Sequence, residues 1–464
     1  MQGGVARFEL FPGEGFQVQG LRVEDAVDGS STWIGTIDTP EEGSVVLTLG
    51  DKGVFGRIDI GLSQYVVQTG ADGHTRVTQI DPAAFADPNL YAGDEEPAPA
   101  ENELTASPAT ALASSSNTVD VLVLYTSASM SSSNTTDPGT LINNLVADAN
   151  NSYIASGVNG ALRTVGYVQF SSYTEPSTGD PNVYKTDALN MQSGTGAFAS
   201  VPNLRNLYGA DLVALLVDGT KMTGTCGNGP IRDTNAASQS SNFAAVIAAT
   251  CAIGDRTFTH ELGHKMSARH NWKQATELTG YYDPTDNAPY HYNHGYWSSS
   301  PAFKDIMAVY PSCNTPPNGG CARINRWSSP TQTYLGAPLG LSGAQPTDMV
   351  TTLSQTMPMV AQYVTPAGMV VPGAPTRVHV QSLNCRGQNE VDTTGASGTV
   401  GWFEVYTASS TSFSPQTLAY SGPDGAVTIN VAGTTYVRAR SCNAAGCSAY
   451  TNADQTATFT NGCF

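Results

Sequence analysis

The stretch that decides the fold is TFTHELGHKMSARHNW, residues 257–272. On a helix, His260 and His264 lie one turn apart on the same face, so both imidazoles can reach one ion, and Glu261 lies beside them. His270 follows His264 by six residues, so the chain must leave the helix and turn back before this third imidazole can join. Because the whole chain has only 7 histidines, this clustering indicates a metal site.

Three neutral imidazoles leave the fourth position of a tetrahedral zinc ion open to water, which is typical of catalytic rather than structural zinc sites. Zinc lowers the pKa of that water to about 7, so hydroxide is available at neutral pH. Glu261 would take the proton of the water and later pass it to the leaving amine, while the metal stabilises the oxyanion of the tetrahedral intermediate. A structural site built from cysteine is not indicated, because the cysteine spacings contain no CxxC pair.

The segment HELGHKMSARH, residues 260–270, resembles the HExxHxxGxxH signature of the metzincin clan of zinc endopeptidases. In that clan a methionine-containing turn follows, and DIMA at residues 305–308 looks like this turn. The resemblance gives Met307 the role of a hydrophobic floor beneath the zinc ligands. A methionine of the ordinary core is the alternative.

Two positions depart from the clan pattern, Ser267 and Asn271. The clan usually has glycine where this chain has Ser267, at a turn that commonly needs a positive φ angle. The Cβ atom of serine disfavours that conformation by about 1–2 kcal/mol. Zinc binding contributes far more than this strain removes, so we expect His270 to reach the metal, with Ser267 either strained or in an adjusted turn.

Three further motifs follow in order: HGYW (294–297), KDIMAVY (304–310) and CARINRWSSP (321–330). They look like the lower subdomain of secreted bacterial metzincins similar to peptidyl-Asp metalloendopeptidases, and the resemblance covers residues 119–363. It implies one catalytic Zn²⁺ ion and protein or peptide substrates, with the aspartate preference as an analogy. Structural Ca²⁺ is left open, since no loop motif for it is visible.

Other side chains near these motifs are weaker candidates. Tyr310 follows Met307 by three positions, whereas the zinc-switch tyrosine of astacin-like enzymes follows by two. We therefore expect Tyr310 to be a packing residue, with a role in supporting a metal ligand as the alternative. His291 and His294 are expected to be exposed loop histidines, because the set of three ligands is already complete.

Composition limits the classes of function. The chain has 464 residues, of which 40% are hydrophobic, enough to fill two or three cores. Only 13% are charged, while 47 Gly and 27 Pro suit β-rich elements joined by many turns. The formal net charge of −18 opposes binding to nucleic acid or anionic lipid, since both need clustered Lys and Arg.

The pattern of apolar residues divides the chain into three folded parts, so we expect a multidomain protein. Residues 1–95 contain short alternating runs such as SVVLTLG and predict a β-rich domain. Residues 118–365 mix strand-like runs (VDVLVLYT, FAAVIAAT) with helix-like ones and predict an α/β domain, by resemblance metzincin-like. Residues 372–464 return to short alternating strands and predict a β-sandwich.

Residues 96–117 are rich in Pro, Ala, Ser and acidic residues and have almost nothing to bury, so we expect a linker open to proteolysis. By resemblance, residues 1–95 are a propeptide-like domain and the linker is the place of activation cleavage. A cysteine switch is excluded, because no cysteine precedes Cys226. YAGD superficially resembles the FxGD aspartate switch of astacins and makes Asp94 a candidate, with a solvated linker carboxylate as the alternative.

The C-terminal part resembles a fibronectin type III domain. The run TYVRARSCNAAGCS, residues 435–448, looks like its sixth strand and the hairpin that follows. Cys442 and Cys447 flank a four-residue turn that can bring them within disulfide reach. Such tails usually adhere to substrates or surfaces, and a passive spacer is the alternative.

Eight cysteines, clustered in sequence, favour four disulfides and an extracellular location. The expected pairs are Cys226 with Cys251, Cys313 with Cys321, Cys442 with Cys447 and, by elimination, Cys385 with Cys463. The opening MQGGVARFEL lacks the basic start and apolar stretch of a signal peptide, so we expect that an export signal was removed or that Met1 is not native. No run approaches 18 apolar residues, so no membrane span is expected. We expect a monomer.

The motif chemistry favours a secreted zinc-dependent endopeptidase, made as a zymogen, that hydrolyses peptide bonds through a zinc-bound water activated by Glu261. The alternative is a catalytically impaired metzincin-like protein that acts as an adhesive or substrate-binding module, which the departures at Ser267 and Asn271 keep open. A zinc amidase acting on cell-wall peptides would use the same chemistry on another substrate. Cleavage preference is not predicted, because side-chain pockets are built from residues distant along the chain.

Overall fold

A computed structural model shows the chain as two compact units. The first unit comprises Met1–Asp25, Ser30–Pro202 and Ala210–Val364, and the second comprises Ala26–Gly29, Asn203–Gly209 and Thr365–Phe464. The residues that the structure describes are 4–11, 13–26, 28–37, 42–85, 117–176, 182–219, 226–232, 240–272, 292–309, 320–364, 371–382, 388–398, 400, 402–414, 416–422, 426–430, 435–443, 446–451 and 454–455.

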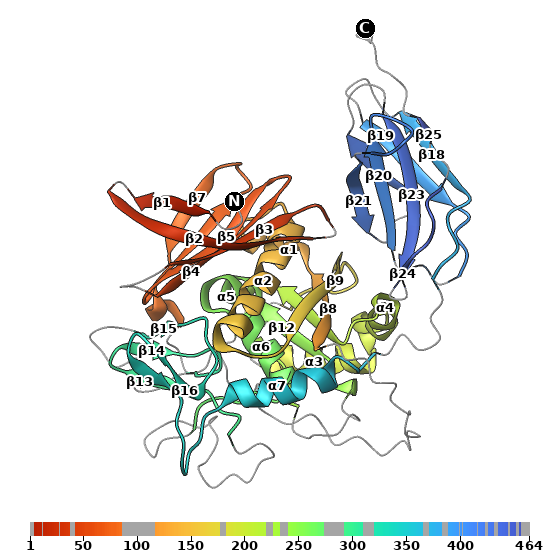
Figure 1. Cartoon of the computed structure of the whole chain (residues 1–464). Helices are drawn as coiled ribbons and strands as arrows, with labels where there is room; N and C mark the ends of the chain where they lie inside the picture. The colour runs from red at the N-terminus through yellow and green to blue at the C-terminus, as the bar shows by residue number, and fades with distance from the viewer. Residues whose placement is uncertain are drawn as a thin grey trace. The chain divides into compact units, whose positions relative to one another are not determined.

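The N-terminal part of the first unit is a seven-stranded antiparallel sheet whose strands pair in chain order (Figure 1). Its strands are β1 Val5–Phe11, β2 Glu14–Asp25, β3 Ser31–Ile37, β4 Gly43–Gly50, β5 Gly53–Ile60, β6 Ser63–Thr69 and β7 Thr75–Gln79. Because side chains alternate between the two faces of a strand, one face gathers an apolar cluster of Val18, Trp33, Ile37, Val45, Ile58 and Tyr65. The short helix η1 (Pro82–Phe85) follows the last strand.

A second, five-stranded sheet lies at the centre of the first unit, in the order β11-β12-β10-β8-β9. Its strands are β8 Thr118–Tyr125, β9 Ala161–Gln169, β10 Leu212–Val217, β11 Gly227–Asn228 and β12 Ala244–Ala248. Four of them run parallel, and the short edge strand β11 is antiparallel to β12. The central strands β10 and β12 are entirely buried, as continuous apolar runs predict for parallel strands covered on both faces.

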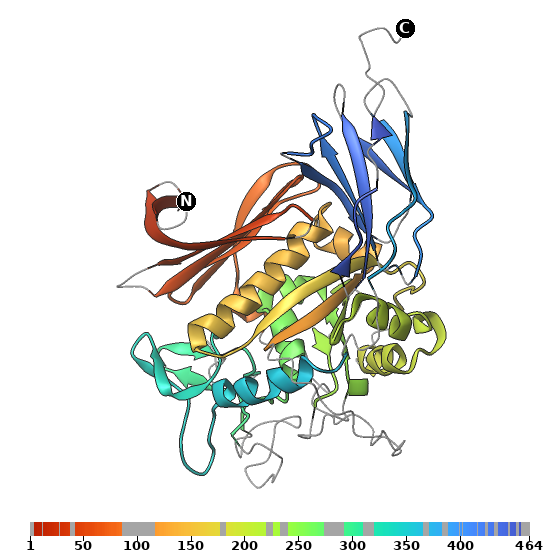
Figure 2. The ribbon, with the colours of Figure 1, turned by 45° about the vertical axis from the view of Figure 1, so that its right-hand side comes forward.

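Helix α2 lies between the two sheets (Figure 2). Asp137 caps its start by accepting from the backbone N of Thr140, Pro138 occupies the first turn, and the helix ends at Gly157 with φ 74°. Of its 19 residues, 15 are buried, so α2 is covered on nearly every side.

The other helices are α1 Ser127–Ser132, α3 Asn182–Ser193, η3 Gly196–Phe198, α4 Val201–Tyr208, α5 Ala249–Asp255, α6 Thr257–Lys265 and α7 Met349–Val360. Two small sheets complete the first unit. Their strands are β13 Trp297–Ser299, β14 Ala302–Lys304, β15 Ala322–Arg323, β16 Ser329–Tyr334 and β17 Ala337–Leu339. Helix α6 is the predicted helix of the histidine motif.

The second unit contains two sheets. One consists of β18 Arg377–Ser382, β19 Gln388–Thr394 and β22 Ala426–Asn430. The other consists of β21 Thr417–Gly422, β20 Trp402–Ala408, β23 Tyr436–Asn443 and β24 Gly446–Cys447, with β25 Asp454–Gln455 paired to β23. Both sheets contribute to one apolar cluster of Val378, Val391, Val405, Val437 and Ala439. The arrangement is that of a small two-sheet β structure.

The architecture agrees in outline with the sequence: a β-rich N-terminal part, an α/β part and a β-rich C-terminal part. One feature differs from three separate domains, since residues on both sides of the predicted linker belong to the same compact unit. The physical reason is a set of buried polar contacts from the N-terminal sheet to α2, to α5 and to Arg256, the residue before α6. Among the helices that the structure describes, none is long and apolar enough to cross a membrane.

Candidate metal centre

The three histidines lie on α6 and in the turn that follows it. Helix α5 ends at Asp255 and α6 begins at Thr257, with Arg256 between them at φ 54°. At the other end of α6, the carbonyl of Gly263 accepts from the backbone N of Met266 at 2.8 Å and from that of Ala268 at 3.0 Å. These bonds satisfy a carbonyl of the last turn and redirect the chain.

Three imidazoles converge in the interior of the first unit, where all three are buried. Nε2 of His260 lies 3.1 Å from Nε2 of His264 and 3.1 Å from Nε2 of His270. Nδ1 of His260 donates to the carbonyl of Ile306 at 2.8 Å, and Nδ1 of His264 donates to that of Ala268 at 2.8 Å. Because Nδ1 carries the proton in both rings, the free lone pair of each ring is on Nε2, and the two Nε2 atoms face each other.

This arrangement fits a bound cation. Lone pairs converging at about 3 Å repel one another unless a positive charge lies between them. Zn–N bonds of about 2.0–2.1 Å in a tetrahedral site place ligand nitrogens roughly 3.3 Å apart, close to the 3.1 Å found between the Nε2 atoms. The ligand atoms of His260, His264 and His270 all lie within 4.8 Å of one another. The donor set can therefore hold a metal ion.

Ser267 forms the turn that brings His270 back to the site. Its φ angle is 69°, in the left-handed region that a Cβ atom disfavours. Of the two arrangements expected from the sequence, the strained turn is the one observed. Oγ of Ser267 accepts from Nη1 of Arg232 at 3.1 Å, and the Ser267 carbonyl accepts from Nδ2 of Asn293 at 2.6 Å. Both bonds help to hold the turn in this conformation.

Glu261 follows His260 on α6 and is also buried. A Cβ atom at Gly227 would lie 2.5 Å from Oε1 of Glu261, and a Cβ atom at Gly229 would lie 3.1 Å from Oε2. The carboxylate thus lies against the backbone of edge strand β11 and the residues just after it. Glycine at these two positions leaves the room that the carboxylate occupies.

Lys265 fixes that backbone to α6. Its buried Nζ donates to the carbonyl of Pro230 at 2.6 Å and to Oδ1 of Asn242 at 2.8 Å. Burial lowers the pKa of Lys265 well below its ordinary value, and the charge of Glu261 offsets part of this shift. The segment against which Glu261 lies is therefore held by bonds from the helix that carries Glu261.

Met307 packs against α6, the helix that carries His260 and His264. Its side chain is buried, and a Cβ atom at Gly263 would lie 2.8 Å from its Sδ. Oδ1 of Asp305 accepts from the backbone N of Met307 at 3.0 Å and of Ala308 at 2.7 Å, which closes the turn. Burial raises the pKa of Asp305 to about 7, although these backbone bonds act in the opposite direction.

Arg323 acts on the carbonyl that orients His260. Its Nη1 donates to the carbonyl of Ile306, which also accepts from Nδ1 of His260. Nη2 of Arg323 pairs with Oδ2 of Asp255 at 3.0 Å, and Nζ of Lys304 lies 3.4 Å from the same oxygen. Burial lowers the pKa of Lys304 to about 8, against the opposing effect of Asp255. Buried charges thus fix the hydrogen bond that sets the orientation of His260.

The residues after His270 are anchored to two other segments. Oδ1 of Asn271 accepts from the backbone N of Val309 at 3.1 Å. The rings of Trp272 and His294 lie 3.7 Å apart between centroids, and Nδ1 of His294 donates to the carbonyl of His270 at 2.8 Å. His294 is only 1% exposed, so the prediction of an exposed loop histidine is wrong. The HGYW segment returns to the chain beside His270, which its spacing in sequence does not reveal.

Two disulfides join the cysteine pairs that the sequence predicts. Cys226, just before β11, is bonded to Cys251 on α5, with their Cα atoms 5.5 Å apart. In the second unit, Cys442 is bonded to Cys447, with Cα atoms 4.0 Å apart. The first disulfide ties the edge strand beside Glu261 to the helix that precedes α6.

Several predicted residues cannot be placed in this way. Cys321 is disulfide-bonded, and its predicted partner Cys313 lies outside the described residues. Outside them lie also Tyr310, Asp94, His291, Cys385, Cys463 and residues 96–116 of the predicted linker.

Sequence reasoning missed some residues that shape the site. The two glycines of GNGP, residues 227–230, could have been recognised, because glycine near a strand often marks a close approach of another group. Arg232 and Asn293 carry no such signal. They lie 35 and 26 residues from Ser267 in sequence, so no local pattern indicates that they meet it.

The chain is similar in sequence to known metallopeptidases. The family model of metallo-peptidase family M12B, reprolysin-like, matches residues 140–271, which run from α2 to just past the third histidine. The chain is 28% identical over 355 residues to a peptidyl-Asp metalloendopeptidase of Stenotrophomonas maltophilia (strain R551-3), covering 73% of this chain and 78% of that protein. It is 29% identical over 343 residues to a peptidyl-Asp metalloendopeptidase of Xanthomonas campestris pv. campestris, covering 69% of this chain and 73% of that protein. A solved structure titled FN3tt matches 19% of this chain and 95% of its own chain, at 17% identity and a TM-score of 0.17.

The buried triad of histidines can hold a metal ion. Together with this site, the family model and the relatives support a metzincin-like metalloendopeptidase.

Proposed function

We propose that this metalloendopeptidase uses zinc, is secreted, and is made as a zymogen. The observation that carries the proposal is the convergence of the three histidine Nε2 atoms, with the buried Glu261 next to His260 on the same helix. His260, His264 and His270 would hold the ion through their Nε2 atoms. When bound, zinc supplies a Lewis acid that lowers the pKa of water and polarises the scissile carbonyl.

The chain's own residues supply proton transfer and orientation. Glu261 takes a proton from the attacking water and passes it to the nitrogen of the scissile bond. A neutral amine then leaves instead of an amide anion, which is a poor leaving group. The carbonyls of Ile306 and Ala268 hold the Nδ1 protons of the first two histidines, so that their Nε2 lone pairs stay available. Lys265 holds the backbone on which the Glu261 carboxylate rests.

The substrate class follows from the relatives. Proteins similar to this chain are named for cleavage at peptidyl-Asp bonds, and we extend this preference to the chain as part of the proposal. Secretion is supported by the disulfides, which persist in oxidising compartments. Activation by a cut within residues 96–117 is supported by the composition of that segment.

The sandwich of the second unit is proposed to be fibronectin type III-like. Support comes from its division into one sheet of β18, β19 and β22 and a second sheet built around β20 and β23. An adhesive role and a spacer role both remain compatible with this architecture. Binding of the chain and of a form lacking residues 365–464 to insoluble protein substrates distinguishes them.

The adhesive alternative for the whole chain is disfavoured by the turn at Ser267. This departure from the clan pattern keeps the left-handed conformation, and His270 still lies with its Nε2 3.1 Å from that of His260. An active site needs all three ligands, whereas an adhesive module does not need them.

Glu261→Gln tests the proposal. Turnover of casein and of an aspartate-containing peptide library should fall at least roughly a hundredfold, because the proton acceptor is lost. Zinc content by mass spectrometry should stay that of the wild type, because the three ligands remain. The matched control is Glu24→Gln on β2, a partly exposed carboxylate paired with Arg22, which should alter neither quantity.

Near wild-type turnover by Glu261→Gln would contradict the role of Glu261 as proton acceptor. If the wild type itself shows no chelator-sensitive digestion, the adhesive alternative takes its place. Products from the library, compared between Asp and Asn at the same position, report the cleavage preference, and cell-wall peptides in the same assay test the amidase alternative.

A further inference from the structure

The face of α2 that meets the N-terminal sheet is polar. Its buried residues Thr140, Asn143, Asn144, Ala147 and Asp148 are spaced by three and four positions and so share one side of the helix. A face of this composition suits contact with water. The α2 side of the interface is therefore compatible with solvent when the two parts are apart.

The N-terminal sheet likewise does not depend on α2 for its apolar cluster. Val45 on β4 belongs to that cluster, whereas its neighbour Val46 points to the other face, where it groups with Ile34 and with Ala147 of α2. The sheet thus has an apolar face of its own and a separate face for α2. The sheet and α2 thus meet as two binding partners do, and not as parts of one continuous core.

Directed hydrogen bonds join the two parts. Nδ2 of Asn144 lies 3.1 Å from the carbonyl of Val46, from Oγ1 of Thr48 and from the carbonyl of Phe55. Nδ2 of Asn143 donates to Oγ of Ser30 at 2.9 Å. At least twelve hydrogen bonds connect residues 4–85 with residues 117–364. Stable interfaces between separate proteins carry about ten.

A buried arginine lies at the centre of this interface. Arg256, the residue before α6, pairs through Nη2 with Asp59 of β5 and through Nε with Asp148 of α2, the latter at 2.9 Å. Burial alone would lower the pKa of Arg256, but the two carboxylates outweigh it and raise that pKa. The carbonyl of Arg256 accepts from the backbone N of His260 at 3.1 Å. The sheet is thus joined to the residue from which the metal-binding helix starts.

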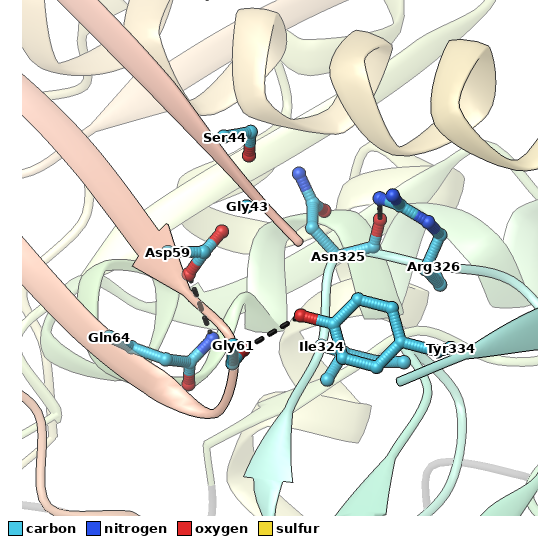
Figure 3. A pocket seen from close by; sticks show the side chains of 9 residues that line it. All are labelled: Gly43, Ser44, Asp59, Gly61, Gln64, Ile324, Asn325, Arg326 and Tyr334. Carbon is cyan, nitrogen blue, oxygen red and sulfur yellow. Dashed lines mark hydrogen bonds between the residues drawn. The ribbon is translucent and has the colours of Figure 1, made fainter. Parts of the chain in front are cut away.

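The two parts also pack closely. A Cβ atom at Gly50 of the sheet would lie 1.9 Å from Oγ1 of Thr140, and one at Gly254 of α5 would lie 2.2 Å from the ring of Phe85. Figure 3 shows a pocket between them, where Asp59, Gln64 and Gly61 face Asn325 and Tyr334. Its volume of about 10 Å³ corresponds to a single water molecule. The interface therefore has the packing of a specific complex.

We infer that residues 4–85 form a binding partner for residues 117–364, and that they stay bound noncovalently, through the interface centred on Arg256, after the chain is cut within residues 96–117. The cut is the activation step of the proposed function, and this inference rests on it. The N-terminal sheet would then be a retained subunit that supports the start of the metal-binding helix, and not a cover that leaves on activation.

The test uses the full chain with Glu261→Gln, so that no autolysis occurs, and with the recognition site of a specific protease placed at residues 101–107. After cutting, size-exclusion chromatography with mass detection should show both fragments in one peak, one copy of each. Separate elution of the N-terminal fragment and a folded larger fragment would overturn the inference. Because no peptide hydrolysis is measured, the result is independent of whether the proposed function is correct.

Asp59→Ala in the same protein should weaken retention of the fragment by roughly a hundredfold on dilution, because Arg256 loses one of its two carboxylates. The matched control is Asp72→Ala, since Asp72 lies in the turn between β6 and β7 and pairs with Arg76 at an exposed position. Equal retention in both variants would overturn the assignment of Arg256 as the centre. If Asp59→Ala fails to fold before cutting, Asn144→Ala takes its place, because Asn144 donates across the same interface to Val46, Thr48 and Phe55. Weaker retention than in Asp72→Ala would support the inference, and equal retention would overturn the claim that this interface holds the fragment.

Discussion

The N-terminal sheet and the C-terminal sandwich are both built from short alternating strands, yet they relate to the metal centre in different ways. The sheet contributes Asp59 to a buried pair with Arg256, directly before the helix that carries His260. The sandwich belongs to a separate compact unit, with its own apolar cluster and the Cys442–Cys447 disulfide. Alternation predicts strands in both cases, but it does not predict which strands become part of the catalytic unit.

Their stabilisation differs accordingly. In the sheet, two charged residues bind groups outside it. Asp59 pairs with Arg256, and Arg57 donates to the carbonyl of Ile253 in α5. In the sandwich, Glu404 of β20 pairs with Arg440 of β23, so that this ion pair stays within the unit. A β structure without cysteine is thus held by its partner, and one with a disulfide is held within itself.

Removal of each part is the strongest way to break this comparison. A chain lacking residues 1–85 should lose roughly 10 °C or more in the melting temperature of the catalytic unit, because several buried polar contacts are lost together. A chain lacking residues 365–464 should melt and bind metal as the first unit does in the full chain. Calorimetry gives the melting temperature of each deletion variant, and metal analysis gives its metal content. Equal losses from the two deletions would show that the contrast is wrong.

A single substitution sharpens the comparison within the sheet. Asp59→Ala should lower the free energy of unfolding of the first unit by about 3–5 kcal/mol, since removal of one partner leaves a buried charge poorly compensated. Asp72→Ala should leave it unchanged within error, because the Asp72–Arg76 pair is exposed to solvent. Urea titrations of both variants provide the measurement. A large effect of Asp72→Ala would mean that charge, rather than burial, controls the outcome.

The two disulfides give the smallest effects and complete the comparison. Replacing Cys442 and Cys447 by alanine should cost the second unit about 2 kcal/mol, because they close a loop of only five residues. The same change at Cys226 and Cys251, 25 residues apart, should cost the first unit about 3–4 kcal/mol. Each change should shift only the melting transition of its own unit. A shift of both transitions would argue against two units.

The convergence of the three histidines could be predicted because they are local in sequence. His260, His264 and His270 lie within eleven residues, and helical spacing alone brings the first two together. The strain at Ser267 could also be anticipated, because the position of the turn follows from the spacing of the histidines. Both depend on short stretches of chain, where local geometry limits the possibilities.

The contacts that support the site could not be predicted, because they join distant segments. Asp59 and Arg256 are 197 residues apart, and Arg323 lies 63 residues from His260. Asn144 and Asp148 give a misleading signal. Polar residues on one helix face predict contact with solvent, whereas here that face is buried against a sheet. Local pattern carries no information on which surface covers such a face.

The central claim is that His260, His264 and His270 bind one catalytic zinc ion. The most direct measurement is an anomalous difference map, recorded on either side of the zinc absorption edge, from crystals of the full chain purified with its bound metal. The account predicts one strong peak among the three Nε2 atoms, next to Glu261, that disappears below the edge. No peak there, or a metal bound with His270 turned away, would contradict it.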